Sequence, residues 1–380
     1  MKLLMVSGDR SILSGRKGAF WYTLQEMQKH WDRIDIICPR VERAEHSKQD
    51  ASTPIGDGGK APHNVFFHPS PRGLWHQPSW IAHRGRELFR AHHHDVMTVH
   101  EYPPFYNGRG AINLHKKTGI PFALEIHHIV GWPVAANLQE HIGHRLSRFI
   151  LPREARYAAR VRAVSGAVAQ ELMHWGIPSA KLEIIPSFYL DHELIGRVAA
   201  PPKSYDIAFC GRFVVNKGCL ELIDALRHLP DARLLLAGDG PLRPELERRI
   251  HAMHAEHRVN FLGWLPTLES VLEAMLTARV FVMPSLSEGG PRSALEAMAC
   301  GMPVVATRVG VMPEVIEDGV NGLFTDGTPK NIAACVSRLL ADETLRERIG
   351  KAAQSVLARF ERRALVEKYA DFLKRIARKE

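Results

Sequence analysis

The sequence predicts an α/β protein built from two doubly wound, Rossmann-like domains, each with a parallel sheet. Short apolar runs alternate with helical stretches along most of the chain, which is the pattern of successive βαβ units. The alternation lapses over residues 187–204, where APPKS at 200–204 indicates a linker, and then it starts again. A length of 380 residues is also sufficient for two domains. We therefore expect a first domain over 1–195 and a second over 203–360.

Seven apolar runs in the first domain are typical of buried parallel strands. They are Leu3–Ser7, Ile34–Pro39, Val65–His68, Val96–His100, Phe122–Ile126, Val161–Ser165 and Leu182–Pro186. Helices are expected near residues 17–31, 78–92, 107–117, 135–158 and 166–175, and the polar segment 41–63 predicts a long loop.

The second domain repeats this pattern, and residues 329–380 at its end are helical and charged. Its apolar runs are Ile207–Cys210, Leu234–Ala237, Val259–Leu262, Val280–Met283, Val304–Thr307 and Leu323–Thr325. Ligands of doubly wound sheets bind outside the carboxyl ends of the strands, so we expect the two domains to face a cleft that holds the site.

Composition and charge favour a soluble protein with anionic partners. The chain carries 50 Lys and Arg against 41 Asp and Glu, a formal charge of +9 that suits phosphates, acidic lipid or nucleic acid, or serves solubility alone. It has no zinc-finger spacing, RNP-like motif or long basic block, so nucleic acid is not expected. Five scattered cysteines without CxxC, a strand-like N-terminus and the lack of a bilayer-length apolar run favour a cytoplasmic location.

The segment 280–307 predicts a strand, a glycine-rich turn, a helix and a second strand. The turn contains Glu288, Gly289, Gly290 and Pro291, and Pro291 suits the first helical position, where its missing N–H group is not needed. Glu296 follows within the helix. Free backbone N–H groups at a helix N-terminus bind anions. Two carboxylates around such a site suit a ligand with hydroxyl groups at both ends and phosphate between them, as in a nucleotide sugar.

Three further loops follow strands of the second domain. FCGRFVVNKG at 209–218 offers Gly211 for a turn, and Arg212 and Lys217 as cations for a diphosphate, unless these are merely surface charges. Two other turns would shape a pocket for the base. They contain Gly238 in one case and Gly263, Trp264 and Leu265 in the other.

The first domain offers a basic loop and a histidine pair. The loop after the first strand lacks G-x-G-x-x-G but remains a plausible phosphate-facing or acceptor-facing loop. It contains Gly15, Arg16, Lys17 and Gly18. His127 and His128 end a strand, a position that faces the ligand in this architecture, although a lone histidine there is more often structural.

Other chemistry has little support. The sequence contains no G-x-S-x-G, P-loop or H-E-x-x-H motif. It also contains no Asp-x-Asp, so a metal held against a diphosphate is not expected, and Arg212 and Lys217 would take that role. We interpret the cluster His92, His93 and His94 as solvated rather than metal binding.

The span Glu288–Glu296 resembles the E-x7-E motif of the retaining GT-B glycosyltransferases of family 4. SEGGPRSALEAMACGMPVVAT, FCGRFVVNKG, LLLAGDGP, VNFLGWLP and VRAVSGAVAQEL are similar to that family. The resemblance covers nearly all of the second domain and is looser over the first. Two positions depart from it: Gly290, where Phe is frequent, and residues 185–190 (IPSFYL), where IPNGVD is common.

The resemblance implies a role for each of these residues. Glu288 would bind the donor hexose, Glu296 the ribose hydroxyls, and the two cations the diphosphate. Gly289, Gly290, Pro291, Arg292 and Ser293 would line the turn around sugar and phosphate. His127 would contact the sugar near the reacting carbon, Gly15 would approach the diphosphate or acceptor, and the helix at 361–380 would cross back onto the first domain.

The implied activity is transfer of a hexose from a UDP- or GDP-sugar to a glycan, lipid-linked or small-molecule acceptor, without cofactor or metal. Such reactions in relatives often build cell-envelope polysaccharide. Retention without an evident nucleophile favours front-face substitution. A non-catalytic nucleotide-sugar-binding subunit of a glycan-assembly complex and a GT-B epimerase remain alternatives.

Residues 143–162 combine six arginines with apolar residues between them. This pattern indicates either a basic amphipathic surface for an anionic membrane or a helix packed into the first domain, interrupted by Pro152. We therefore expect a cytoplasmic protein, either free in the cytoplasm or peripheral at the inner membrane face.

Overall fold

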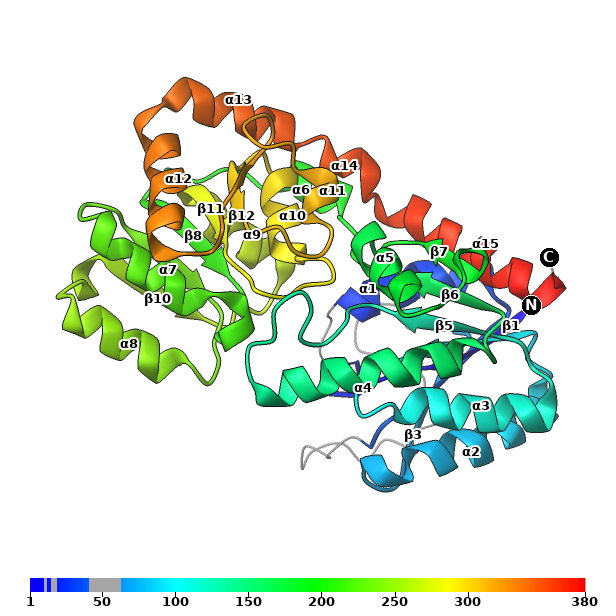
Figure 1. The fold of residues 1–380 in the computed structure, drawn as a ribbon. Helices are drawn as coiled ribbons and strands as arrows, with labels where there is room; N and C mark the ends of the chain where they lie inside the picture. Colours follow the sequence, from blue (N-terminus) through cyan, green and yellow to red (C-terminus); the bar gives the residue numbers. More distant parts are fainter. Residues whose placement is uncertain (10–11, 15–18, 41–62, 380) are drawn as a thin grey trace. The chain divides into compact units, whose positions relative to one another are not determined.

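The computed structural model describes residues 1–9, 12–14, 19–40 and 63–379, which form two compact units (Figure 1). The first unit comprises Met1–Val130, Ile142–Ser187 and Arg362–Glu380, and the second comprises Gly131–His141 and Phe188–Glu361. The basic loop at 15–18 and nearly all of the polar segment 41–63 lie outside the described residues.

The first unit contains a parallel seven-stranded sheet in the order β3-β2-β1-β4-β5-β6-β7. The strands are β1 (Lys2–Val6), β2 (Arg33–Cys38), β3 (Val65–Pro69), β4 (Val96–His100), β5 (Phe122–Ile126), β6 (Arg160–Ala163) and β7 (Leu182–Ile184). Each corresponds to a predicted apolar run. The order reverses between β1 and β4, which is the switch point beside which ligands of such sheets bind.

Helices α1 (Ala19–Met27), α2 (Gln77–His92), α3 (Tyr106–Thr118), α4 (Leu138–Ala155) and α5 (Gly166–His174) connect these strands, together with the short helices η1 (Ile12–Ser14), η2 (Gln28–His30), η3 (Leu74–His76) and η4 (Ser179–Lys181). The first turn of α4 is grouped with the second unit. The last helix, α15 (Arg362–Arg378), packs against α1, β4 and β5. It buries residues at helical spacing, including Val366, Tyr369 and Leu373. The predicted return of the final helix to the first domain is therefore confirmed.

The second unit contains a parallel six-stranded sheet in the order β10-β9-β8-β11-β12-β13. The strands are β8 (Tyr205–Cys210), β9 (Leu234–Ala237), β10 (Val259–Gly263), β11 (Ala278–Met283), β12 (Val304–Ala306) and β13 (Leu323–Phe324). The switch point lies between β8 and β11, so the loops that follow these two strands are neighbours.

The helices of the second unit lie between and after these strands. They are α6 (His192–Arg197), η5 (Val215–Lys217), α7 (Cys219–Ala225), η6 (Leu226–His228), α8 (Arg243–Ala252), η7 (Glu256–Arg258), α9 (Leu268–Leu276), α10 (Arg292–Ala299), α11 (Met312–Val315), α12 (Pro329–Ala341), α13 (Glu343–Ala353) and α14 (Val356–Arg359). Residues of α7 and α12 form one buried core with β8, β9 and β11.

The interpretation of the histidine cluster as solvated is wrong for His94, which is only 3% exposed. Its Nε2 atom lies 2.7 Å from Oδ2 of Asp35, a carboxylate that His68 and Arg33 also contact. Burial alone would raise the pKa of Asp35, but hydrogen bonds from His68, His94 and Arg33 hold the pKa well below its usual value. His94 is therefore a structural residue that is held by Asp35 of β2.

Two acidic side chains, Glu101 after β4 and Glu154 on α4, are buried beside each other, 5% exposed in each case. Both face Gly108, where a Cβ would collide with both carboxyl groups. Burial raises the pKa of Glu154, and the neighbouring Glu101 raises it further. Burial likewise raises the pKa of Glu101. The pair is therefore held in the folded state with fewer negative charges than two exposed carboxylates would carry.

We expect Glu154→Gln to raise the melting temperature relative to wild type, by a margin that grows as the pH rises from 5 to about 8. Because the folded-state pKa is raised, the unfolded wild-type chain loses this proton first, so wild-type stability falls as the pH rises above the usual carboxyl pKa. Melting curves across this range measure the effect. The control is Glu367→Gln, which makes the same change at an exposed position of α15. A pH-independent difference for Glu154→Gln would contradict the shift.

Candidate functional site

In the second unit, an ion pair joins the loops that follow β8 and β11. Nζ of Lys217 donates to Oε1 of Glu288, and Oγ of Ser285 donates to the same oxygen at 3.0 Å. The Lys217 and Glu288 side chains are 22% and 11% exposed, so both remain reachable from solvent. The two residues that the sequence places in separate motifs therefore lie in direct contact.

Backbone contacts hold these two loops together. Leu286 N–H donates to the carbonyl of Asn216 at 2.9 Å. Gly218 has φ +67°, and a Cβ there would collide with the carbonyl of Pro284. A side chain at position 218 would therefore push the loop that carries Lys217 away from the strand end that leads to Glu288.

The turn after β11 leads into helix α10, and several backbone N–H groups at this helix N-terminus donate no hydrogen bond within the described chain. Helix α10 begins at Arg292 and Pro291 is its N-cap residue, so the prediction that Pro291 is the first helical residue is wrong by one position. Within the described chain, the N–H groups of Gly289, Gly290, Arg292 and Ser293 donate no hydrogen bond. N–H groups clustered in this way at a helix N-terminus can bind an anion.

Glu296 lies one turn into α10 and is only 4% exposed. Nε of Arg292 donates to its Oε1 atom at 2.7 Å. Burial and the nearby Glu296 carboxylate raise the pKa of Cys210 to about 12, so this thiol stays protonated and is not a nucleophile. The structure thus places the Arg292 side chain against the Glu296 carboxylate.

The remaining predicted donor residues lie at adjacent strand ends on the same edge of the sheet. Gly211 N–H donates to Ala237 O at 3.0 Å, and Gly238 N–H donates to Gly263 O at 2.8 Å, so the loops after β8, β9 and β10 are neighbours. Arg212, in the first loop, is exposed. In the third loop, Trp264 is 67% exposed and Leu265 is partly buried.

The two departures from the family pattern meet in space. A Cβ at Gly290 would lie 1.9 Å from the ring of Phe188, so that ring occupies the space beside the turn. Phe188 is 7% exposed and its ring stacks at a tilt on Phe360, with centroids 5.3 Å apart. Because Phe188 fills this volume, a side chain at position 290 would have to displace the Phe188 ring. The sequence shows both departures but not that one compensates for the other.

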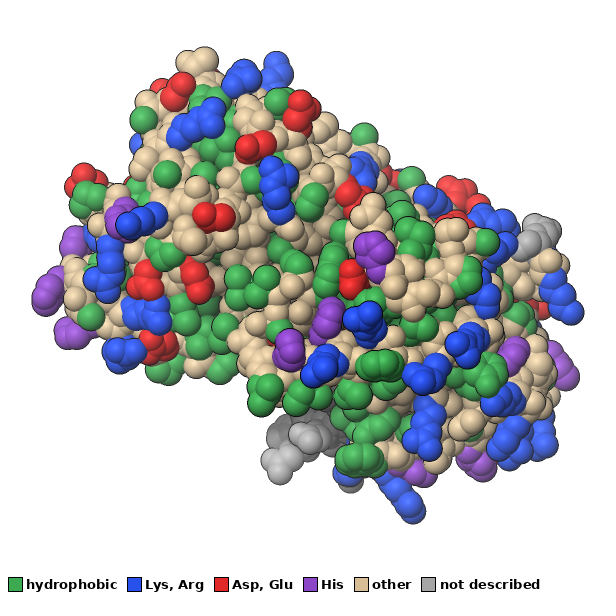
Figure 2. Space-filling model, viewed as in Figure 1, with side chains coloured by type: hydrophobic (Ala, Val, Ile, Leu, Met, Phe, Trp, Pro, Cys, Tyr) green, Lys and Arg blue, Asp and Glu red, His purple; other side chains and the backbone are tan. Residues whose placement is uncertain are grey.

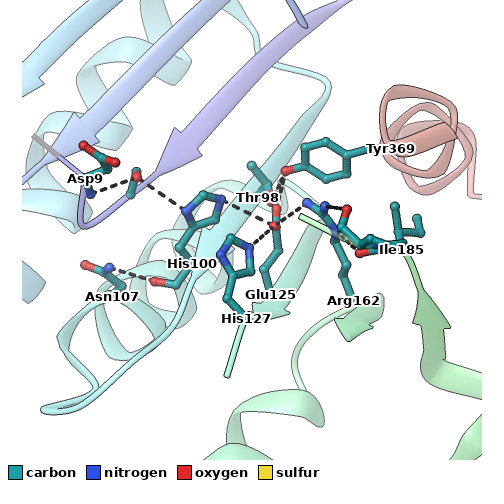
Figure 3. Close-up of polar contacts among 11 residues, drawn as sticks. Asp9, Thr98, His100, Asn107, Glu125, His127, Arg162, Ile185 and Tyr369 are labelled. Carbon is teal, nitrogen blue, oxygen red and sulfur yellow. Dashed lines mark hydrogen bonds and ion pairs between the residues drawn. The ribbon is translucent and has the colours of Figure 1, made fainter. Parts of the chain in front are cut away.

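In the first unit, Glu125 is fully buried at the end of β5 and is the centre of a polar network (Figure 3). Thr98 from β4 and Tyr369 from α15 donate hydroxyl hydrogen bonds to its Oε1 atom. Nη1 of Arg162 from β6 lies 2.8 Å from Oε2. Arg162 is 1% exposed, and its guanidinium carbon lies 3.9 Å from the centroid of the Tyr369 ring.

His127 and His100 approach the same carboxylate from the surface side. Nε2 of His127 lies 3.0 Å and Nε2 of His100 lies 3.4 Å from Oε2 of Glu125. The His127 side chain is 38% exposed. Loss of solvation lowers the pKa of His127, and the adjacent His100 lowers it further, against the opposing effect of Glu125. His127 is therefore neutral at pH 7. Because its Nε2–H group donates to the Glu125 carboxylate, its Nδ1 atom can accept a hydrogen bond from a ligand.

His100, Glu125 and His127 offer ligand atoms within 4.8 Å of one another, a spacing that a metal ion could use. Arg162 already neutralises the same Oε2 atom of Glu125, and a second cation there would be repelled. We therefore assign the cluster to orienting His127. Of the other predicted first-domain residues, His128 is exposed and Gly15, Arg16, Lys17 and Gly18 lie outside the described chain.

The sequence reasoning missed Glu125, His100, Arg162 and Tyr369. Two of them carried a signal: a charged residue inside an apolar run, as in FALEI and RVRA, is unusual in a buried parallel strand and calls for a partner.

We expect Arg162→Met to lower the free energy of unfolding by ~3–5 kcal/mol, because it leaves the buried Glu125 carboxylate without its ionic partner. The matched control is Arg160→Met on the same strand, which removes a bond to the carbonyl of Ala180 and should cost about 1 kcal/mol. Urea titrations measure both. Equal losses in the free energy of unfolding would show that the buried ion pair contributes no more to stability than the Arg160 hydrogen bond.

We expect Gly290→Ala to cost ~1–3 kcal/mol through collision with Phe188. Phe188→Ala should cost ~3–5 kcal/mol by opening a cavity. In the double variant the added methyl group enters that cavity, so its stability should equal or exceed that of Phe188→Ala alone. Gly196→Ala, in a helix with open space around the glycine, is the control. Additive losses in the double variant would contradict the packing described here.

Two family models match the chain. The model described as Glycosyltransferase Family 4 matches residues 20–189, and the model described as Glycosyl transferases group 1 matches residues 192–356. Together they span most of the sequence.

Curated relatives match mainly in part. Sulfoquinovosyl transferase SQD2 of Arabidopsis thaliana is 32% identical over 231 residues, 59% of this chain and 44% of the relative. The lipopolysaccharide core biosynthesis glycosyltransferase LpsE of Rhizobium meliloti is 35% identical over 43% of this chain and 48% of the relative. A GDP-mannose-dependent phosphatidylinositol dimannoside mannosyltransferase of Mycobacterium tuberculosis is 34% identical over 37% of each chain. The matched regions thus span less than half of each of these relatives.

Solved structures share the fold along the whole chain. Sucrose-phosphate synthase from Thermosynechococcus elongatus superimposes with a TM-score of 0.80 over 100% of both chains at 19% identity. Anabaena HepE in complex with UDP and glucose gives a TM-score of 0.71 over 98% of this chain and 99% of that chain at 21% identity. With both family models and two parallel-sheet Rossmann-like units, the chain belongs to the family 4 glycosyltransferases of the GT-B fold.

Proposed function

We propose that this glycosyltransferase is a retaining hexosyltransferase that uses a UDP- or GDP-linked sugar. The observation that carries the proposal is the contact between Lys217 and Glu288 beside the unused N–H groups that precede α10. The Glu288 carboxylate, for sugar hydroxyls, and the Lys217 ammonium group, for phosphate, thus lie beside these N–H groups at the carboxyl-terminal edge of the sheet. That combination matches the hexose and diphosphate of one donor.

Each residue has a defined task in this proposal. Glu288 binds the hexose hydroxyl groups and stabilises positive charge that develops on the ring. Lys217 and Arg212 hold the diphosphate and offset its charge as it leaves, so the donor requires no metal. Glu296, oriented by Arg292, binds the ribose hydroxyls, and the turns at Gly238 and Gly263 border the base.

His127 contributes from the first unit in this proposal. Its neutral imidazole, held by Glu125, contacts the sugar near the reacting carbon. The leaving diphosphate accepts the proton of the acceptor hydroxyl while the new bond forms on the same face. Positioning and electrostatic stabilisation then supply most of the rate enhancement.

The relatives support a donor of this class. Structures of HepE contain UDP and UDP-glucose, and the mycobacterial mannosyltransferase is named for GDP-mannose. LpsE and LpsD of Rhizobium meliloti are named for lipopolysaccharide core biosynthesis, and the mycobacterial enzyme is named for a phosphatidylinositol dimannoside, which favours an acceptor in the cell envelope. All five cysteines are free, as suits the reducing cytoplasm proposed for this reaction.

We expect the true donor to raise the melting temperature in a screen of UDP-glucose, GDP-mannose and ADP-glucose. A ligand present at 100 times its Kd stabilises the folded state by about 2.7 kcal/mol.

Lys217→Ala and Glu288→Gln should each lower the rate of sugar transfer or donor hydrolysis at least ~100-fold, because each removes charge stabilisation in the transition state. Lys330→Ala, an exposed lysine of α12, should leave the rate unchanged.

Three results would count against the proposal. Wild-type turnover in either site variant removes the site assignment. Donor binding without any turnover in the wild type supports the non-catalytic subunit instead. A product of inverted anomeric configuration, measured by NMR of the new linkage, rules out the retaining mechanism, and release of an epimerised sugar without an acceptor supports the epimerase.

A further inference from the structure

Helix α4 exposes an apolar stripe on the side opposite its packed face. Leu138, Ile142, Leu146 and Phe149 follow the spacing i, i+4, i+8 and i+11, which places them on one face. They are 73%, 50%, 47% and 60% exposed, respectively. The residues that α4 buries, such as Leu151, lie on the other side. Large apolar side chains gathered at the surface indicate a face that contacts something else.

Helix α3 and the segment before α2 extend this stripe within the first unit. Nζ of Lys116 on α3 lies 4.6 Å from the ring centroid of Tyr157, which follows α4 and is 43% exposed. A cavity of about 310 Å³ is lined by Tyr106 of α3 and Ile150 of α4, so the two helices are neighbours. The ring of Trp75, 89% exposed, lies 5.7 Å from that of Tyr106. We call Trp75, Tyr157, the exposed residues of α3 and the exposed residues of α4 from Ile142 onward the α3–α4 surface, all of which belong to the first unit.

The α3–α4 surface is strongly basic. Its exposed cations are Arg109, Lys116, Lys117, Arg145, Arg148, Arg153 and Arg156. Helix α3 contains no Asp or Glu, and the two carboxylates of α4 are Glu140 in its first turn and the buried Glu154. Figure 2 shows blue and green side chains over α3 and α4 without red ones among them. The cations therefore lack acidic partners on their own helices.

We propose that the α3–α4 surface binds the face of an anionic lipid bilayer. Aromatic and aliphatic side chains enter the interfacial region, while the arginines around them pair with lipid phosphates. An acidic protein would satisfy the cations but would not require protruding rings such as Trp75 and Phe149, so the combination favours lipid. None of the described helices is long and apolar enough to cross a bilayer, and the contact proposed here is at the surface. The inference does not depend on the transferase reaction.

Vesicle flotation of the full chain tests this inference without any sugar donor. We expect binding to phosphatidylcholine vesicles that contain about 30% phosphatidylglycerol, much weaker binding to pure phosphatidylcholine, and a steep decrease with salt. The apolar variant, Leu146→Ser with Phe149→Ser, should bind the anionic vesicles about tenfold or more weakly, since both side chains lose buried area. The charge variant, Arg145→Glu with Arg148→Glu, should do the same.

Each variant has a matched control in the second unit. Leu262→Ser with Val320→Ser removes two exposed apolar side chains, and Arg227→Glu with Arg338→Glu makes the same change in net charge. Both controls should bind like wild type. Circular dichroism and melting temperature establish that all four proteins are folded.

Three outcomes would overturn the inference. The first is no flotation of wild type in low salt. The second is an equal loss of binding in a variant and its control, which would mean that binding does not depend on the α3–α4 surface. The third is a dimer in light scattering that the apolar variant abolishes, without vesicle binding, which would assign the surface to a second copy of the chain.

Discussion

The buried carboxylate of Glu125 is the interaction on which the first unit most depends. It receives hydrogen bonds from β4, β6 and α15 at the point where these elements meet. An ionised group without access to water is costly to bury unless donors of this kind compensate for its lost hydration. The carboxylate therefore fixes the docking of the final helix and, through its second oxygen, the orientation of His127. The Glu125 side chain thus both holds α15 on the sheet and orients His127.

The second unit depends on close approach of backbone rather than on a buried charge. Gly218 and Gly238 each lie where a Cβ would collide with a carbonyl of a neighbouring loop. Their contacts bring the loops after β8, β9 and β11 together at the switch point of the sheet. Lys217 and Glu288 meet there as a consequence, although 70 residues separate them in sequence. Short glycine-rich loops thus create a charged site from two unrelated segments.

The sequence predicted more of the candidate site in the second unit than in the first. Glu288, Glu296 and Lys217 lie in local motifs, and the structure places each after a strand, at the carboxyl-terminal edge of the second sheet. The roles assigned to these residues remain proposals. The network around Glu125 was not predicted, because its members come from strands and a helix that are distant in sequence. The charged residues within FALEI and RVRA indicate that each needs a partner, but they do not indicate which partner. His94 was interpreted as solvated for the same reason: its partner Asp35 lies 59 residues earlier.

The sequence by itself determined the strands and helices, since their apolar periodicities are local, and it determined the motif that predicts a sugar-nucleotide ligand. Only the tertiary structure decided which side chains became partners. Gly290 and Phe188 are separate departures from a family pattern until strand order and loop packing bring them together. Likewise, the arginines of α4 could have been buried or exposed. The packing of the opposite face of that helix left them in solvent, because a helix can bury only one face against a single sheet.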